Sequence, residues 1–317
     1  MHGVRVFLVL VFCCVFSAVA EPTIAERLGW PEGSKVLMIH ADDAGLSHAS
    51  NQAIFENAAA GTVTSASIMM PCSWVPEFVL YLKKNPDFCA GIHLTYTAEW
   101  DNYRWSPVAG RDAVPGLVDE MGFMHDNVPL VVQHSNAEEV EKELRAQIAL
   151  AEKMGIDISH MDSHMGTLFA TPEYFEAYVK VGIEKQIPLL MVGGHGTHLN
   201  RENPGRSEQL KPVADKLWAS GLPVLDDLST ASYSWKTLDK REELSALIRD
   251  LEPGVTWINV HPTLPNEEGK SITNNRELLF GDYLTLNDPA IMALLKEEKV
   301  YLTSWRELHA RRKALKE

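Results

Sequence analysis

Short apolar runs alternate with longer segments of helical periodicity along this chain. Eight runs have the length of strands, at residues 35–41, 63–70, 90–95, 157–163, 188–192, 222–227, 255–261 and 299–303. Most of them lack the apolar and polar alternation of a half-exposed strand, which indicates a parallel sheet covered on both faces. The chain has no composition break, linker or repeat. The pattern therefore predicts a single α/β domain folded as a distorted (β/α) TIM-like barrel.

Boundary signals support helices between these strands. Ser135 and Glu138 have the spacing of a capping box, and Gly155 is placed to end the helix that follows. Thr171-Pro172 and Asp288-Pro289 each have the pattern of an N-cap residue followed by a first-turn proline. We expect a helix to begin at each of these pairs.

The first 20 residues have the pattern of a secretory signal peptide. Arg5 precedes an apolar core, and small residues stand at positions 18–20 before Glu21. The apolar run is short for a membrane span of about 20 residues, and an uncleaved anchor is the alternative. We expect residues 21–317 to form one mature domain that is secreted or periplasmic after cleavage, without stable membrane insertion.

Charge and cysteine content limit the partners and the cross-links. The formal net charge is −14 at pH 7, and it becomes −15 once Arg5 is removed with the signal segment. Such acidity argues against nucleic acid and anionic membranes as partners.

Removal of the signal segment also leaves Cys72 and Cys89. They would lie at opposite ends of neighbouring parallel strands, beyond the ~7 Å Cα separation that a bridge allows. We predict no disulfide. The oligomeric state is open, a homo-oligomer included.

Acids and histidines gather at the ends of three of the apolar runs. The residues are Asp42 and Asp43 after the first run, His93 in the third, and His160, Asp162 and His164 around the end of the fourth. The carboxyl ends of barrel strands meet at one face. Histidine and aspartate supplied by several strand ends therefore predict a mononuclear hydrolytic metal centre.

The adjacent aspartates pose a geometric problem. Successive side chains of an undistorted strand point to opposite faces, so Asp42 and Asp43 can share a site only if the turn at Ala44-Gly45 relaxes the alternation. We assign Asp43 to the metal and Asp42 to the general base that deprotonates a metal-bound water. An exchange of the two roles is the alternative, as is a capping role for one of them at the helix near Ser47.

The fourth run offers three polar side chains on one strand face. His160, Asp162 and His164 follow the period of two. With His164 as a ligand, Asp162 would orient an imidazole or hold a sugar hydroxyl, and His160 would lie behind the ligands or serve the core.

Another strand ends in His261, which we assign as general acid because a leaving amine must be protonated and an imidazole ordinarily titrates near neutrality. His195 and His198 lie in a glycine loop, which we interpret as a substrate lid without a direct catalytic role.

A long insertion at about residues 96–135 follows the run that contains His93. Loops of this length in compact domains are usually functional or mobile. Trp100, Tyr103 and Trp105 stand there beside hydrogen-bonding residues, a combination that suits stacking on a sugar ring. We take Trp100 and Trp105 as candidate substrate contacts, with packing of the loop onto the barrel as the alternative. Three other tryptophans are assigned to packing: Trp218, Trp235 and Trp257.

The chain contains the motifs HADDAGLSHASNQAIFENAAAGTVTSASIMM, GIHLTYT and HMDSH. In this order and spacing, they resemble the YdjC-like carbohydrate deacetylases, whose best-known members act on chitooligosaccharides. The resemblance implies a distorted barrel that holds one divalent metal through Asp43, His93 and His164, and His261 falls in a run similar to the late histidine-proline motif of the family. Two imidazoles and a carboxylate suit zinc, whereas family members are often assigned magnesium, so Mg²⁺ and Zn²⁺ both stay open.

Two departures from the family pattern bear on the substrate. Chitooligosaccharide-active members continue HxDSH into further histidines, where this chain has Met165-Gly166-Thr167-Leu168, and His40 stands where asparagine is usual. We expect a secreted metal-dependent hydrolase that deacetylates N-acetylated sugars or oligosaccharides. One alternative is hydrolysis of another carbohydrate ester or amide. Another is a catalytically silent glycan-binding protein, which would have no need of both Asp42 and His261.

Overall fold

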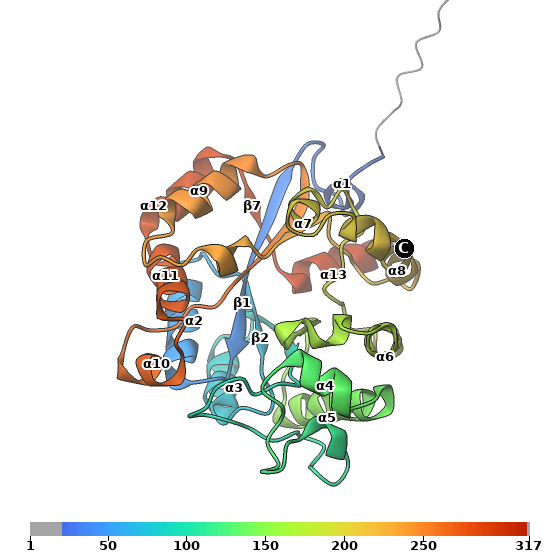
Figure 1. Cartoon of the computed structure of the whole chain (residues 1–317). Coiled ribbons are helices and arrows are strands. Elements are labelled where there is room, and N and C mark those ends of the chain that lie inside the picture. The colour runs from blue at the N-terminus through green and yellow to red at the C-terminus, as the bar shows by residue number, and fades with distance from the viewer. Residues whose placement is uncertain (1–20, 316–317) are drawn as a thin grey trace, which may run out of the picture.

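An all-parallel sheet forms the centre of the computed structural model, which describes residues 21–315 (Figure 1). The strands run in the order β4-β3-β2-β1-β6-β5, and β7 also pairs with β1. Their bounds are β1 Lys35–Ala44, β2 Ser65–Ile68, β3 Cys89–Leu94, β4 Met161–Ser163, β5 Asp227–Ser229, β6 Gly254–Val260 and β7 Tyr301–Leu302. The signal peptide predicted for residues 1–20 lies outside the described residues.

The barrel is distorted between β4 and β5. The strand predicted at residues 188–192 forms only single bridges to its neighbours, and the strand predicted at 222–227 is assigned from Asp227 onward. The bridges pair Met161 with Leu189 and Val192 with Leu225. Because isolated bridges replace a full ladder here, the molecule is a distorted TIM-like barrel, as the sequence predicts.

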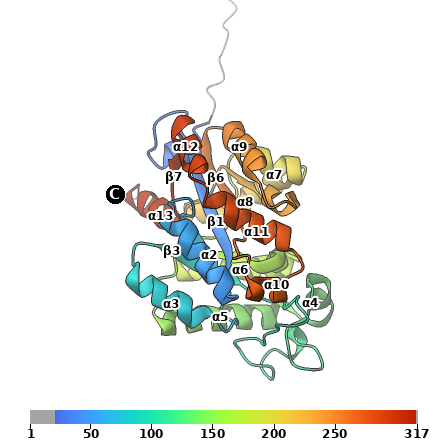
Figure 2. The same ribbon diagram turned by 90° about the vertical axis from the view of Figure 1, so that its left-hand side faces the viewer.

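Helices surround the sheet, and α10 and α11 pack beside α2 (Figures 1 and 2). The α-helices are α1 Ile24–Arg27, α2 His48–Ala59, α3 Val75–Lys84, α4 Val128–His134, α5 Ala137–Met154, α6 Pro172–Lys185, α7 Thr197–Glu202, α8 Arg206–Ala219, α9 Arg241–Asp250, α10 Glu267–Ile272, α11 Arg276–Leu286, α12 Pro289–Glu297 and α13 Trp305–Ala314. Three 3₁₀ turns complete the set: η1 Pro115–Leu117, η2 His164–Phe169 and η3 Ala231–Ser234.

Strand β1 lies at the middle of the core. All of its residues except Lys35 are buried, which explains why its sequence is a continuous apolar run rather than an alternating one. Trp305 of α13 is fully buried against the same core. The polar residues at the end of β1 are therefore held in place by a packed core.

Three of the helix boundary predictions are confirmed and one is wrong. Gly155 ends α5 with a φ of +80°, and Thr171 and Asp288 cap α6 and α12. The cap of α5 is Asn136, whose side chain accepts the N–H groups of residues 138 and 139. Ser135 instead ends α4 and donates to Glu139, so the neighbouring asparagine, an equally good cap, takes the role.

The insertion at residues 96–135 is anchored to the barrel. It contains η1 and α4, and both oxygens of the buried Glu143 of α5 accept backbone N–H groups from the loop, those of Val108 and Ala109. These bonds hold in place a part of the insertion that lies outside η1 and α4.

Both described cysteines are free and buried, as predicted. Cys89 begins β3 opposite Ser65 at the start of β2, whereas Cys72 follows the far end of β2. Among residues 21–315, no helix is long and apolar enough to cross a membrane.

Candidate metal centre and its surroundings

The adjacent aspartates of β1 reach one site because the strand bulges. The register between β1 and β2 shifts between Ala41 and Ala44 by one residue. Asp43 has a φ of +61°, a left-handed conformation that aspartate adopts more readily than most residues. A bulge places an extra residue in one strand and redirects its side chain. The alternation is therefore broken, as the shared site requires, but by a bulge between Ala41 and Ala44 rather than by the Ala44-Gly45 turn that the sequence indicated.

Asp43, His93 and His164 converge in the structure, as the sequence predicted. Oδ1 of Asp43 lies 3.5 Å from Nε2 of His93 and 3.4 Å from Nδ1 of His164. The three residues are 7%, 4% and 3% exposed. Oδ1 of Asp43 is buried without a hydrogen-bond partner, a costly arrangement for a carboxylate. One carboxylate oxygen and two imidazole nitrogens within 4.8 Å of one another fit a divalent cation.

A carboxylate lies behind each imidazole. Nδ1 of His93 is 2.6 Å from Oδ1 of Asp162, and Nε2 of His164 is 2.8 Å from Oε1 of Glu99. Each contact determines which ring nitrogen is left facing Asp43. Asp162 thus orients an imidazole, one of its two predicted roles. Glu99 was missed, although an acid shortly after the His93 strand is a signal that the sequence contains.

Asp42 lies beside this group with four polar neighbours. Its Oδ2 is 3.4 Å from Nε2 of His261 and accepts a hydrogen bond from Asn259 at 3.2 Å. Its Oδ1 accepts from Ser67 at 3.3 Å and lies 3.3 Å from Nε2 of His40. The two predicted catalytic residues are therefore neighbours, and both line the same cavity.

The surrounding imidazoles keep both aspartates ionised. Burial raises the pKa of the Asp42 carboxyl, but His93 and His40 lower it by more, so the net shift is downward. The pKa of Asp43 is also lowered, because His164, His261 and His93 together outweigh the effect of burial. Two ionised carboxylates in one buried site favour a bound cation.

Histidines beside these carboxylates hold their protons. Burial lowers the pKa of His164, but Glu99 and Asp43 outweigh it and raise the pKa to about 10. For His40, Asp162 and then Asp42 outweigh burial and raise the pKa to about 9. A cation that binds His164 must therefore displace a proton from it.

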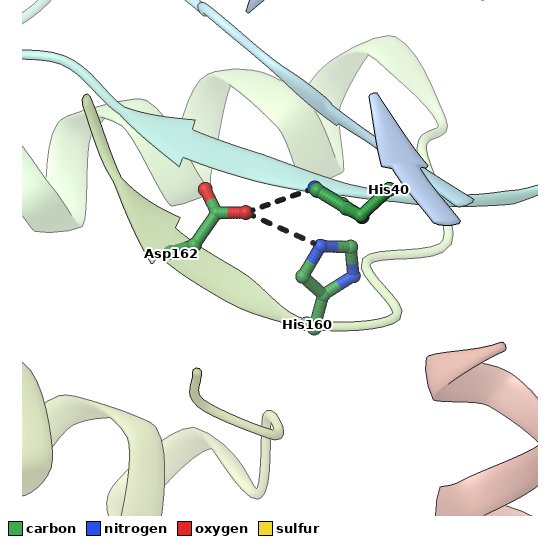
Figure 3. Close-up of side chains that lie close together, drawn as sticks. All are labelled: His40, His160 and Asp162. Carbon is green, nitrogen blue, oxygen red and sulfur yellow. Dashed lines mark ion pairs between the residues drawn. The ribbon is translucent and has the colours of Figure 1, made fainter. Parts of the chain in front are cut away.

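His40, His160 and Asp162 form a buried group behind the site (Figure 3). Oδ2 of Asp162 lies 3.0 Å from Nε2 of His40 and 3.6 Å from Nε2 of His160. His160 also stacks on Trp305, with ring centroids 5.3 Å apart. Gly91 is required here, because a Cβ atom at that position would lie 2.4 Å from the His160 ring. His160 thus supports Asp162 from behind, and His40 had no predicted role.

The backbone of His261 is held by a buried ion pair. Its N–H donates to Asp282 at 2.8 Å, and Asp282 lies 2.6 Å from Nζ of Lys240. The ring of Tyr233 packs edge-on against the imidazole at a centroid distance of 4.6 Å. Nδ1 of His261 is buried without a partner. The imidazole is therefore fixed with Nε2 toward Asp42.

The aromatic residues of the insertion pack on one another. Trp105 is 5% exposed, and its ring lies 5.6 Å from the rings of both Trp100 and Tyr103. These three do not line the cavity beside Asp42, whereas Trp257, which the sequence assigned to packing, is 2% exposed and does. Sugar stacking by Trp100 or Trp105 stays a prediction.

The two loop histidines lie outside this cavity. Nδ1 of His198 is 2.6 Å from Oδ2 of Asp227, and Nδ1 of His195 is 2.9 Å from Oγ1 of Thr197. Neither lines the wall of the cavity. These contacts give each histidine a partner without any link to the metal centre.

Fold and site together define a distorted TIM-like barrel with a candidate metal centre at the carboxyl ends of its strands. The chain belongs to the YdjC-like protein family, whose sequence model matches residues 36–297.

Individual relatives cover most of the chain. The carbohydrate deacetylase of Thermus thermophilus is 30% identical over 280 residues, which span 86% of this chain and 94% of the relative. That of Thermoanaerobacter pseudethanolicus is 25% identical, with 86% and 98% covered. The structure of a "putative cellobiose-phosphate cleavage protein" from Enterococcus faecalis, 23% identical, covers 87% of this chain and 99% of its own with a TM-score of 0.72. This last likeness confirms the fold.

Proposed function

We propose that this protein is an exported, metal-dependent deacetylase of N-acetylated sugars or oligosaccharides. The observation that carries the proposal is that His93 and His164 converge on Oδ1 of Asp43, a buried oxygen without a hydrogen-bond partner. Asp42 and His261 lie alongside. Two relatives that span 86% of the chain are named carbohydrate deacetylases, which supports the carbohydrate substrate.

Asp43, His93 and His164 would hold one divalent cation. Bound there, the cation would lower the pKa of a water molecule and polarise the acyl oxygen of the substrate. Two nitrogens and one oxygen form a donor set that suits zinc better than magnesium, and Mg²⁺ remains the alternative. Asp162 and Glu99 would hold the two imidazoles in the tautomer that binds.

Asp42 and His261 would move the protons. Asp42 is ionised and oriented by Asn259 and Ser67, so it can accept the proton of the attacking water. His261 would donate from Nε2 to the leaving nitrogen of the sugar amide. The 3.4 Å separation of Nε2 from Oδ2 of Asp42 lets the base recharge the acid, which balances the protons over one turnover. The products are acetate and a free amino sugar.

Export rests on residues 1–20 alone. The test is the mass of the protein recovered outside the cytoplasm after expression of the full chain. A mature N-terminus at Glu21 would support cleavage after Ala20. Full-length protein in the membrane fraction would contradict it and favour the uncleaved anchor.

Acetate release tests the reaction. Protein comprising residues 21–317 would be given N-acetylglucosamine oligomers and O-acetylated glycans, with and without chelator and with Zn²⁺ or Mg²⁺ added back. We expect acetate from the amino sugars, lost with chelator and restored by one of the cations. Release from O-acetylated glycans alone would establish a carbohydrate esterase instead. No acetate from a folded, metal-loaded protein that still binds glycans would favour the silent binding protein.

A further inference from the structure

The cavity beside the candidate metal centre is large for an acetyl group and one sugar ring. Its volume is about 760 Å³. One side is formed by residues of the site, among them Asp42, His93, His164 and His261. The cavity continues from them past β4 and η2 to α7 and α8, and apart from Asp162 and His164 the residues on that side have no part in the proposed reaction.

That continuing wall is apolar. Six of its side chains are hydrocarbon or thioether groups from five different segments: Met165, Phe169, Leu190, Leu199, Leu210 and Leu228. The polar side chains that accompany them are Asn203, Arg206 and Thr230, of which Asn203 and Thr230 are exposed and Arg206 is half-buried. Apart from Met165, the apolar side chains of the wall are buried or half-buried, and the two exposed polar residues lie where the wall meets solvent.

Met165 is the most exposed part of this apolar wall. It is 48% exposed, and it follows His164 directly with a φ of +51°. A left-handed conformation is unfavourable for a methionine, which has no side-chain group to compensate for it. This residue begins the segment where chitooligosaccharide-active relatives continue with histidines, so the chain places a strained apolar side chain beside the site where polar ones are common.

An apolar wall discriminates between substituents of the substrate. Sugar hydroxyls that face it lose hydrogen bonds to water and gain none in return. Methylene groups that face it leave water, and each buried methylene strengthens binding about fourfold. The wall therefore favours a hydrocarbon chain over a second bare sugar ring.

From this geometry we infer that the substrate is an acylated sugar that carries an apolar chain, which lies along the wall from Met165 to Leu210. The chain is either the aglycone of the sugar or an acyl group longer than acetyl, since both supply the same hydrocarbon. The inference rests on the proposed deacylation for its reaction, but the binding of the chain can be measured without turnover.

Two ligand series separate the sources of the chain. One series is methyl, butyl and octyl N-acetylglucosaminide, and the other is methyl glucosaminide N-acylated with acetyl, butyryl or octanoyl, all below their micelle concentrations. Binding is measured by calorimetry on the Asp42→Asn protein, and amine release is measured on the unmodified protein. We expect the octyl or the octanoyl compound to bind at least tenfold more tightly than the methyl acetyl compound. Equal affinities across both series would overturn the inference.

Variants of the wall test where the chain lies. Met165→Asn removes the apolar group and suits the left-handed backbone, so the fold should tolerate it. Leu228→Thr removes an apolar group from β5, and threonine suits a strand. Both should reduce the ratio of long-chain to methyl affinity several-fold. The control is Leu80→Ser, on α3 at 57% exposure, which should leave the ratio unchanged. An unchanged ratio in both wall variants would contradict the assignment.

The outcomes distinguish this inference from the proposed function. Chain-dependent binding that the wall variants weaken, without amine release from any compound, would sustain the apolar site and refute deacylation. Amine release at equal rates from every chain length would sustain deacylation and refute the apolar site.

Discussion

Oε1 of Glu99 lies 2.8 Å from Nε2 of His164, on the side of the ring away from Asp43. The insertion thus reaches back to the candidate metal centre through one carboxylate. His93 has the same relation to Asp162, but that partner comes from the barrel itself. The two imidazoles of the site are therefore oriented by one rigid element and one loop.

Glu99→Gln should weaken metal binding about 10- to 100-fold, because the amide orients the imidazole less strongly and lowers its basicity. Competition with a chromophoric chelator measures the change. Asp101→Asn, an exposed acid two residues further along the same loop, is the matched control and should bind metal normally. Equal affinities for both variants would show that Glu99 does not position His164.

Asp42→Asn and Asp43→Asn should separate the base from the ligand. The first should reduce turnover at least about 100-fold while the bound metal stays stoichiometric, because a general base contributes roughly that factor. The second should lose its metal. Metal content by elemental analysis, measured beside acetate release, decides between them. Loss of metal from Asp42→Asn alone would exchange the two roles.

His40 should make the stability of the protein depend on pH. Its pKa is raised from 6.5 to about 9 in the folded protein, so the folded state binds this proton more tightly than the unfolded state. The stabilisation is complete below pH 6.5 and is lost as the pH rises through about 9. Urea unfolding between pH 6 and 10 should show the decline.

The free energy of unfolding of His40→Gln should depend less on pH, because glutamine does not titrate. His48→Gln, at a half-exposed histidine of α2, controls for the loss of a ring and should keep the slope of the unmodified protein. A slope that survives in His40→Gln would assign the pH dependence to another group.

Asp226 should hold the start of the folded chain. Its buried carboxylate accepts the N–H groups of Ile24, Ala25 and Val255 at 2.7, 3.1 and 2.7 Å. Asp226→Asn turns one acceptor into a donor that faces these groups, and we expect a loss of about 2 to 4 kcal/mol in the free energy of unfolding. Urea denaturation measures it. Asp215→Asn, at an exposed position on α8, should change stability by less than about 0.5 kcal/mol.

The metal centre was predictable to the extent that it depends on strand ends. Asp43, His93 and His164 were among the candidates because each lies at the end of a short apolar run, and the ends of parallel strands meet at one face. The resemblance to the YdjC-like family then singled out these three as the ligands. The role of Glu99 was not predicted, because loop residues follow no period that tells which way their side chains point. The packing of Trp105 on its own loop was not predictable for a related reason. Nothing in the sequence says whether an aromatic residue of a loop faces that loop or a cavity.

By itself, the sequence determined the barrel class, the segments that form most strands and the identity of the three candidate ligands. These features depend on local sequence, namely on continuous apolar runs and on the residues that end them. The tertiary structure alone decided which side chains lie beside Asp42 and which lie beside Asp43. That depends on the bulge against β2 and on the left-handed backbone of Asp43. It also decided that an apolar wall continues from the site, because side chains from five separate segments make that wall only when the barrel has closed around them.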